Sequence, residues 1–466
     1  MGETASIRLS RFAAETSIAG LSSELAGDVV NRLVDLIGVA LAAVGDPTAK
    51  AVEETVIAWG GEGTSTTFGS GLQLSATSAA LINGTLAHAL DFDDTHLPSI
   101  VHPSSSVIPA ALAVGEEVDA SGDELLTSVA VGLEATVRLG MASYDVESRN
   151  HVFFERGLHA TSILGTLGAA VAAGCLYDLG VHQLANAIGI ASSMGAGLLE
   201  ANRTGGTVKR LHNGWAAHSG VTAAQLARSG ITGPPTVLEG RFGLFQAFSD
   251  DRWSIDPVTN GLGQHWEFPL VHYKPYPTNH FTHAGIDGAL EALRQGVDIG
   301  SIRRIQLGVP EPTLRTIAEP IEEKRAPATG YAAKFSGPFT VAAALAAGSG
   351  LGVGHEDFTD AMVSDPLRLR LAGLVECVED AVASERFPNA FGGVLRIWTD
   401  DPQPAEYRIV DSKGGPRTPL TDAELDAKFL DNVTRSNVVM VPGDLLETLR
   451  STGCGTGVRT LMAELA

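Results

Sequence analysis

Apolar residues in the first half of the chain recur every three or four positions, which predicts a series of consecutive helices. One helix begins at Ser22 or Ser23, whose hydroxyl can cap its first turn, and ends at the turn Gly45–Pro47. Its apolar positions are Leu25, Val29, Leu33, Leu36 and Ile37. We therefore expect the first half of the chain to fold as an all-helical unit.

Two further predicted helices flank a cluster of polar residues. The first carries Ile82, Leu86 and Ala89 on one face and runs into Asp91. The second begins after Pro103, which suits a first helical turn. More helical stretches cover residues 121–141, 159–176, 181–195 and 208–229. The chain has 53 glycines and recurring Ala-Gly runs, so we expect its helices to pack closely.

The pattern changes near residue 265, where alternation of apolar and polar residues predicts strands. An Ala-rich helix over about 338–348 lies among them, and a Thr421/Glu424 capping box begins a final helical region. The predicted strands contain Ile305, Leu307 and Val309, then Leu395, Ile397 and Thr399, then Tyr407 and Ile409.

These patterns predict a mostly α fold with two domains. At 466 residues the chain is too long for one small core. A large, discontinuous all-helical domain comprises residues 1–265 and 418–466, and a smaller α+β domain comprises residues 266–417.

The net charge of −22 argues against nucleic acid and against an anionic membrane surface as partners. The charge is unevenly distributed. From His151 to His283 eight Lys/Arg balance eight Asp/Glu, and this stretch holds nine of the 13 histidines. A neutral, His-rich middle suits a site for an anionic substrate, although a buried middle inside an acidic surface gives the same pattern.

Three widely spaced cysteines and an N-terminus without a signal pattern are typical of a cytoplasmic protein. Residues 157–177 carry no charge and are long enough to span a bilayer. They include His159 and four glycines, so we interpret them as a core helix.

The first candidate site is the segment from Asp91 to His96, followed by His102. Asp91, Asp93 and Asp94 follow a helix C-terminus, where the helix dipole disfavours negative charge by about 0.3–1 kcal/mol each. Stability alone does not favour this arrangement. It indicates a catalytic carboxylate or a cation site, and the alternative is a solvated acidic turn.

A second group of candidates lies within the neutral stretch from His151 to His283. His159 lies at the start of the uncharged helix, either as a catalytic group or as a satisfied core residue. Arg203 precedes a Gly pair, and the next helix places Lys209 and His212 on one face. A buried Lys is costly without a partner, so a ligand carboxylate is a reasonable one.

A third group lies where the pattern changes. Two prolines hold the segment containing Lys274 and Tyr276 extended, so both side chains point the same way. A helix carrying His283 follows, with His280 just before it. The alternative interpretation is a rigid linker between domains with incidental polar residues.

In this order the candidate segments resemble the MmgE/PrpD family, from about residue 20 to the end of the chain. The resemblance is carried by LINGTLAHALDFDDTH, HPSSSVIPAALAVGE, GLHATSILGTLGAA, GGTVKRLHNGWAAHSG, TGPPTVLEGRFG, YKPYPTNHFTHAGID and AKFSGPF. It implies a homodimer in which the α+β domain is a lid, with a site between the domains that uses no metal or organic cofactor.

Family members include 2-methylcitrate dehydratase, cis-aconitate decarboxylase and iminodisuccinate epimerase. Residues implicated in such enzymes match Asp91, Thr95, His102, His159, Lys209 and Lys274. A histidine of the catalytic region in some members falls at Asn279, next to His280. We expect the substrate-binding residues to be Thr95, Arg203, His212, Tyr276, His280, His283, Lys334 and Ser336.

The resemblance implies a lyase that moves a proton next to a carboxylate of a small di- or tricarboxylate. Lys209, Lys274 and the imidazoles would supply positive charge, and His102 or His159 would transfer the proton. Dehydration ranks slightly ahead of decarboxylation, with epimerisation behind both. Two other classes remain open: a non-catalytic helical binding protein, and a metal-dependent hydrolase that uses Asp91, Asp93, Asp94 and His102.

Overall fold

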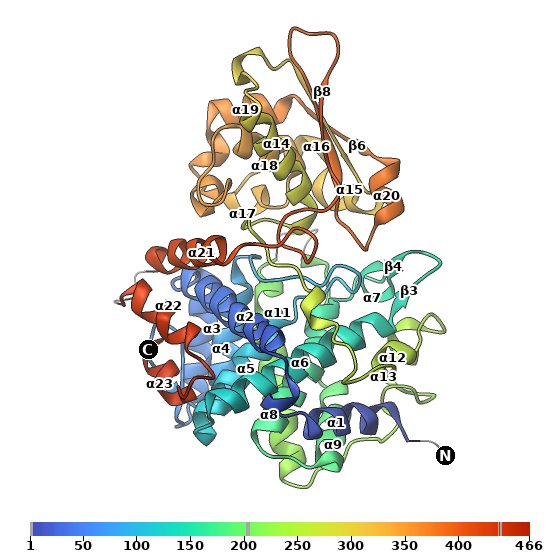
Figure 1. Ribbon diagram of the computed structural model, residues 1–466, viewed down its shortest axis with the longest axis vertical. Helices are drawn as coiled ribbons and strands as arrows, with labels where there is room; N and C mark the ends of the chain where they lie inside the picture. Colours follow the sequence, from blue (N-terminus) through green and yellow to red (C-terminus); the bar gives the residue numbers. More distant parts are fainter. Residues whose placement is uncertain (1–2, 202–205, 437, 439) are drawn as a thin grey trace. The chain divides into compact units, whose positions relative to one another are not determined.

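The computed structural model describes residues 3–201, 206–436, 438 and 440–466. The chain forms two compact units: Met1–Val271 with Phe429–Ala466, and His272–Lys428. The longer segment of the first unit extends past residue 265. Near its end the carbonyls of Phe268 and Val271 accept hydrogen bonds from the buried Arg32 guanidinium, both at 3.1 Å. The fold is mostly α, as predicted (Figure 1).

The first unit is built from helices, with two short strand pairs. The helix predicted at Ser22 is confirmed, since the Leu25 amide donates to the Ser22 hydroxyl at 3.2 Å. The pairs are β1 (Ser65–Thr66) with β2 (Gln73–Leu74), and β3 (Tyr144–Asp145) with β4 (Asn150–His151). The helices before the second unit are α1 (Ala5–Glu15), α2 (Ser23–Ala42), α3 (Pro47–Trp59), α4 (Ala76–Ala89), α5 (Ser104–Val118), α6 (Gly122–Ala142), α7 (Val152–Glu155), α8 (Ala160–Leu176), α9 (Val181–Ser192), α11 (Val208–Arg228), α12 (Leu244–Ser249) and α13 (Asp256–Thr259).

Helices α4 and α11 run antiparallel and meet backbone to backbone. A Cβ atom added to Gly214 would lie 2.3 Å from the Leu81 carbonyl oxygen, and one added to Gly84 would lie 2.8 Å from the Gly214 Cα. The predicted close packing of helices is therefore confirmed here. Because of this contact, the end of α4, which carries His88, lies against the beginning of α11, which carries Lys209.

Two uncharged or weakly charged helices form the centre of this unit. Helix α8, which the sequence identified as a core helix, is buried along Ala160–Gly174. Helix α6 is long and apolar enough to cross a membrane, but 89% of its most apolar window is buried inside the protein. Both therefore have the surroundings of core helices.

The second unit combines helices with a four-stranded sheet of order β6-β5-β7-β8. β5 pairs parallel with β6, and the other pairs are antiparallel. The three predicted strands are confirmed as β5 (Arg304–Val309), β7 (Gly393–Trp398) and β8 (Ala405–Ile409). The remaining elements are α14 (His283–Arg294), α15 (Glu311–Ile317), α16 (Ile321–Arg325), α17 (Gly330–Ala333), α18 (Gly337–Leu345), α19 (Pro366–Gly373), β6 (Val375–Glu379) and α20 (Ala381–Arg386).

Strand β6 has no counterpart in the sequence prediction. It lies at the edge of the sheet, and of its five residues only Val375 is buried, so it lacks the alternation that identified the other strands. The predicted Ala-rich helix is α18, which packs with α14 and begins at the Ser336 cap.

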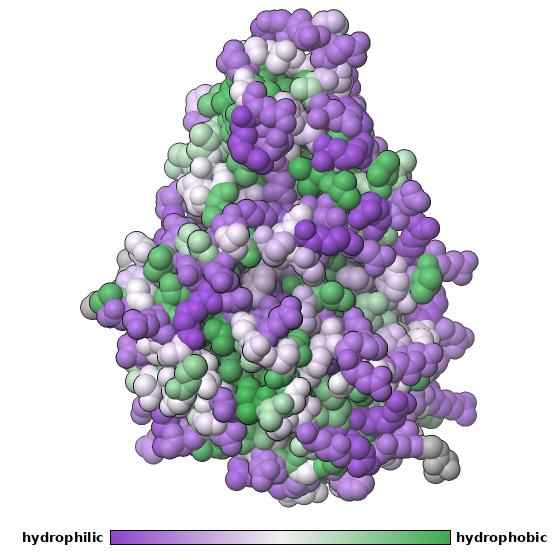
Figure 2. Space-filling model, viewed as in Figure 1, coloured by the Kyte–Doolittle hydropathy of each residue, from purple (hydrophilic) through white to green (hydrophobic). Residues whose placement is uncertain are grey.

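The second unit ends at Lys428, and the chain returns to the first unit at Phe429. The predicted capping box is confirmed: the Thr421 amide donates to the Glu424 carboxylate at 3.0 Å, and the Glu424 amide donates to the Thr421 hydroxyl at 3.2 Å. It precedes α21 (Asp422–Arg435), followed by α22 (Pro442–Arg450), which packs on α2, and α23 (Val458–Ala463), which packs on α5. Figure 2 shows a mainly hydrophilic face with scattered apolar side chains, in keeping with the net charge of −22.

Candidate active site

The acidic segment that follows α4 is buried. Every residue from Asp91 to Leu97 is buried, and Asp91 itself adopts a left-handed backbone conformation with φ of 54°. Asx side chains tolerate this conformation better than most residues, so an Asp can end the helix here. The solvated acidic turn that the sequence left open is therefore excluded.

Each of the three carboxylates has a cationic or imidazole partner from a different part of the chain. Asp91 pairs with Lys209 of α11 at 2.7 Å, and the two side chains are 2% and 8% exposed. Asp93 lies 2.8 Å from the Nδ1 atom of His88. Asp94 pairs with Arg32 of α2 at 2.9 Å and accepts a hydrogen bond from the Ser104 hydroxyl at 2.6 Å.

The Asp94 pair has a structural role. Burial raises the pKa of Asp94 to about 6, and the Arg32 guanidinium opposes that rise. Arg32 also donates to the carbonyls of Phe268 and Val271, so it joins α2, the Asp94 turn and the end of the first unit's longer segment. We infer that this pair holds the turn in place.

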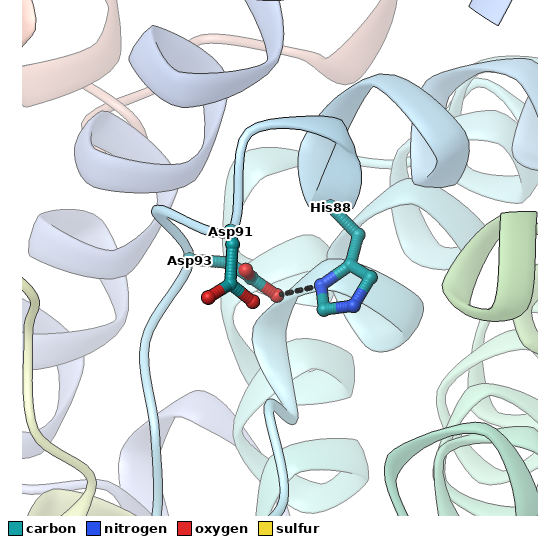
Figure 3. A group of neighbouring side chains, drawn as sticks. All are labelled: His88, Asp91 and Asp93. Carbon is teal, nitrogen blue, oxygen red and sulfur yellow. Dashed lines mark hydrogen bonds and ion pairs between the residues drawn. The ribbon is translucent and has the colours of Figure 1, made fainter. Parts of the chain in front are cut away.

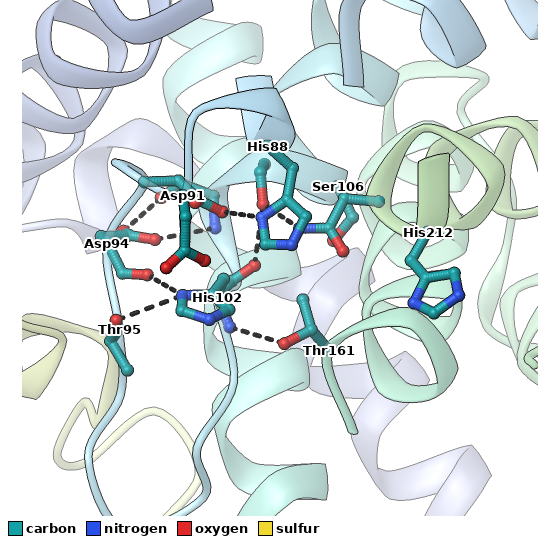
Figure 4. Close-up of polar contacts among 12 residues, drawn as sticks. His88, Asp91, Asp94, Thr95, His102, Ser106, Thr161 and His212 are labelled. Atoms are coloured by element: carbon teal, nitrogen blue, oxygen red, sulfur yellow. Dashed lines mark hydrogen bonds and ion pairs between the residues drawn. The ribbon is translucent and has the colours of Figure 1, made fainter. Parts of the chain in front are cut away.

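His102 is oriented by three contacts (Figure 4). Its Nδ1 atom lies 2.6 Å from the Asp94 carbonyl oxygen and 3.1 Å from the Thr95 hydroxyl, and its backbone amide donates to Thr161 at 3.0 Å. A carbonyl only accepts, so Nδ1 carries the proton. In the neutral ring Nε2 is then the basic nitrogen.

His159 and His212 form a buried pair whose Nδ1 atoms are 2.8 Å apart. One nitrogen must donate and the other accept, so the pair shares a hydrogen. Burial, followed by the charges of His212, His88, Lys209 and His102, lowers the pKa of His159 well below its usual value. Burial, followed by His88 and Lys209, lowers the pKa of His212 to about 4.

These two imidazoles are therefore neutral at neutral pH, which corrects the expectation that all the imidazoles supply positive charge. Lys209 is the cation that the structure places beside them, and it helps to keep them neutral. In this neutral form each ring can donate one hydrogen bond and accept another.

His88 is a member of this cluster that the sequence analysis missed. It lies in the last turn of α4 and is 1% exposed. Its ring centroid is 5.3 Å from that of His102 and 5.7 Å from that of His159. A histidine one turn before three carboxylates was the signal that could have identified it.

The side chains of His88, Asp91 and Asp93 bring three potential metal-ligating atoms within 4.8 Å of one another (Figure 3). The Lys209 ammonium lies 2.7 Å from one of these carboxylates and opposes a second cation there. Two of the four ligands predicted for a metal hydrolase have other partners: Asp94 pairs with Arg32, and the His102 Nδ1 atom contacts a backbone carbonyl.

The structure thus brings together, in the first unit, six of the residues predicted for the site. They are Asp91, Thr95, His102, His159, Lys209 and His212. Arg203 lies outside the described residues.

The other predicted residues lie in the second unit, where all are buried. The Tyr276 hydroxyl donates to Asp287 at 2.6 Å, and its ring packs on His283. The His280 and His283 rings are 4.5 Å apart. The backbone carbonyl of Lys334 accepts from Asn279. The Ser336 hydroxyl caps α18 and donates to the Lys324 carbonyl. Lys274 is 1% exposed.

The sequence matches the MmgE/PrpD N-terminal domain over residues 7–256 and the MmgE/PrpD C-terminal domain over residues 276–438. The chain belongs to the MmgE/PrpD family. The resemblance that the sequence motifs indicated is thereby confirmed.

Several curated relatives carry one activity in their names. The cis-aconitate decarboxylase-like protein oryM of Aspergillus oryzae is 28% identical over 66% of this chain and 67% of its own length. Human cis-aconitate decarboxylase is 29% identical over 81% of this chain and 76% of its own. For the Aspergillus terreus cis-aconitate decarboxylase the identity is 29%, over 59% and 57%, so the match spans less than two thirds of that relative.

Proposed function

We propose that this family member is a lyase that acts on a small polycarboxylate, with decarboxylation of a cis-aconitate-like acid as the first candidate reaction. The observation that carries the proposal is the buried Lys209–Asp91 pair beside the imidazoles of His88, His102, His159 and His212. The names of the relatives move decarboxylation ahead of dehydration, which the sequence alone ranked slightly higher.

Lys209 suits the binding of a substrate carboxylate. Its ammonium group is buried and already pairs with a carboxylate, that of Asp91. A second carboxylate in the same environment would interact strongly, because little water screens the charge. The same ammonium would stabilise the negative charge that develops on the substrate as a bond to carbon breaks.

The imidazoles suit proton transfer. In a decarboxylation the C–C bond to one carboxylate breaks, CO₂ leaves, and the electron pair stays on carbon until a proton forms the new C–H bond. The proton must come from an acid in the site. We assign this role to His102, since burial holds His159 neutral and the buried carboxylates have partners that favour their ionised forms. Thr95, which contacts His102, would bind a substrate oxygen.

The remaining expectations extend this proposal. We propose that the enzyme needs no metal or organic cofactor, that Lys274 contributes to catalysis, and that the protein is a cytoplasmic homodimer. Activity after chelation tests the first point, replacement of Lys274 by Met the second, and sedimentation the third.

The test is an NMR assay in D₂O with cis-aconitate, citrate, 2-methylcitrate and iminodisuccinate. We expect loss of a carboxylate from the cis-aconitate skeleton and deuterium on the carbon that carried it. Loss of water or inversion at a carbon would assign dehydration or epimerisation to the same residues. Lys209→Met should abolish turnover, whereas Lys50→Met, which alters an exposed lysine on α3, should not. Binding without any bond change would refute the lyase.

A further inference from the structure

His88 and Asp93 form a buried pair that the proposed reaction leaves without a role. The Nδ1 atom of His88 lies 2.8 Å from Asp93 Oδ2, and both side chains are fully buried (Figure 3). An ionised carboxylate only accepts hydrogen bonds, so Nδ1 must carry a proton. The lone pair of the neutral imidazole is therefore on Nε2.

The Nε2 atom of His88 is buried and has no hydrogen-bond partner within the described part of the chain. Leaving a buried acceptor unsatisfied is unfavourable, so a purely structural role does not account for this arrangement. A catalytic role does, because a basic nitrogen without a partner is ready to take up a proton.

The surroundings of His88 favour that protonation. Asp93 and Asp91 bring negative charge within 4.8 Å, and Lys209, which pairs with Asp91, brings positive charge. His102, His159 and His212 are the other imidazoles facing it, and burial holds the last two neutral. The Asp93 carboxylate directly contacts the protonated Nδ1 atom of His88.

We propose that His88, held by Asp93, is the proton reserve of this site: it carries a proton on Nε2 and returns it to His102 after His102 has protonated the substrate carbon. The proposal rests on the proposed lyase function. The two ring centroids are 5.3 Å apart, which allows a hydrogen bond between facing ring nitrogens. Each turnover consumes one proton: His102 gives its Nε2 proton to carbon, His88 restores it, and solvent recharges His88. His88 is thus a positioning residue that acts through His102.

Asp93→Asn tests the reserve, since it keeps the shape of the side chain and removes the charge. The reserve acts only while it is protonated, and Asp93→Asn removes the counter-charge of that imidazolium. The kcat profile of the variant should therefore lose activity on its alkaline side first. We expect kcat at neutral pH to fall about tenfold or more with KM nearly unchanged. Glu116→Gln, a buried carboxylate that hydrogen-bonds Thr66 outside the cluster, should leave the profile in place.

Ring ¹⁵N NMR of the wild type, Asp93→Asn and His88→Gln provides a readout that needs no turnover. In the wild type the His88 Nδ1 signal should be that of a protonated nitrogen hydrogen-bonded to a carboxylate, and Asp93→Asn should abolish it. A wild type that converts none of the acids refutes the lyase, and this signal then decides by itself whether Asp93 holds the His88 proton. If the wild type turns over and Asp93→Asn has the same pH dependence of kcat, the proton-reserve role of His88 is wrong and the lyase function is unaffected.

Discussion

Replacing Lys209 by Met removes the cation that the structure places at the buried Asp91 carboxylate. The ammonium and the carboxylate are 2.7 Å apart, with 8% and 2% of their side chains exposed. Removing one partner of such a pair leaves a buried charge uncompensated, which typically destabilises a protein by about 3–5 kcal/mol. We therefore expect Lys209→Met to lower the free energy of unfolding of the first unit by about that amount.

The pairing predicts a rescue. Asp91→Asn in the Lys209→Met background removes the uncompensated charge, so the double variant should regain about 2 kcal/mol or more. Its turnover should stay abolished, because neither charge is left to act on the substrate. Loss of stability and loss of catalysis would then be separated in one pair of variants.

The assay is urea unfolding followed by tryptophan fluorescence and circular dichroism, together with turnover of cis-aconitate. Lys50→Met, at an exposed position of α3, controls for the loss of a lysine. The reasoning is refuted if Lys209→Met unfolds with the wild-type midpoint, or if the double variant is as unstable as the two single changes added together.

Other consequences of the structure can be tested in the same way. Because His159 and His212 are held neutral, a bound polyanion should raise their pKa values, so the protein should take up protons on binding. Calorimetry in buffers of different ionisation enthalpy measures this uptake, and zero uptake below pH 6.5 would contradict the prediction. Burial lowers the pKa of His151 from 6.5 in the unfolded chain to about 4, so the unfolded state binds more protons between these values. Stability should fall as the pH drops through that window, and His151→Gln should flatten the dependence. Gly214→Ala places a Cβ 2.3 Å from the Leu81 carbonyl, so it should lower the free energy of unfolding by about 1–3 kcal/mol and remove most of the activity. The control is Gly27→Ala, where a Cβ has nothing within 4 Å, and this change should be neutral or slightly stabilising.

The sequence by itself determined the secondary structure and most of the chemistry. Periodicity located α2, α4, α5 and α11, and alternation located three of the four strands of the second unit's sheet, because these signals are local. The motifs identified the family, and with it five of the six side chains that the first unit brings together. The sixth, His212, was predicted from its helical spacing to Lys209. Strand β6 was missed, since an edge strand with one buried residue carries almost no alternation.

Only the tertiary structure decided which charge neutralises which. Asp91, Asp93 and Asp94 look equivalent in the sequence, yet their partners are a lysine 118 residues away, a histidine five residues away and an arginine 62 residues away. The Asp91–Lys209 pairing depends on the close contact of α4 and α11 at Gly84 and Gly214, which no local pattern encodes. Protonation follows the same rule: burial and neighbouring charge decide whether an imidazole is neutral, and both exist only once distant segments have packed together.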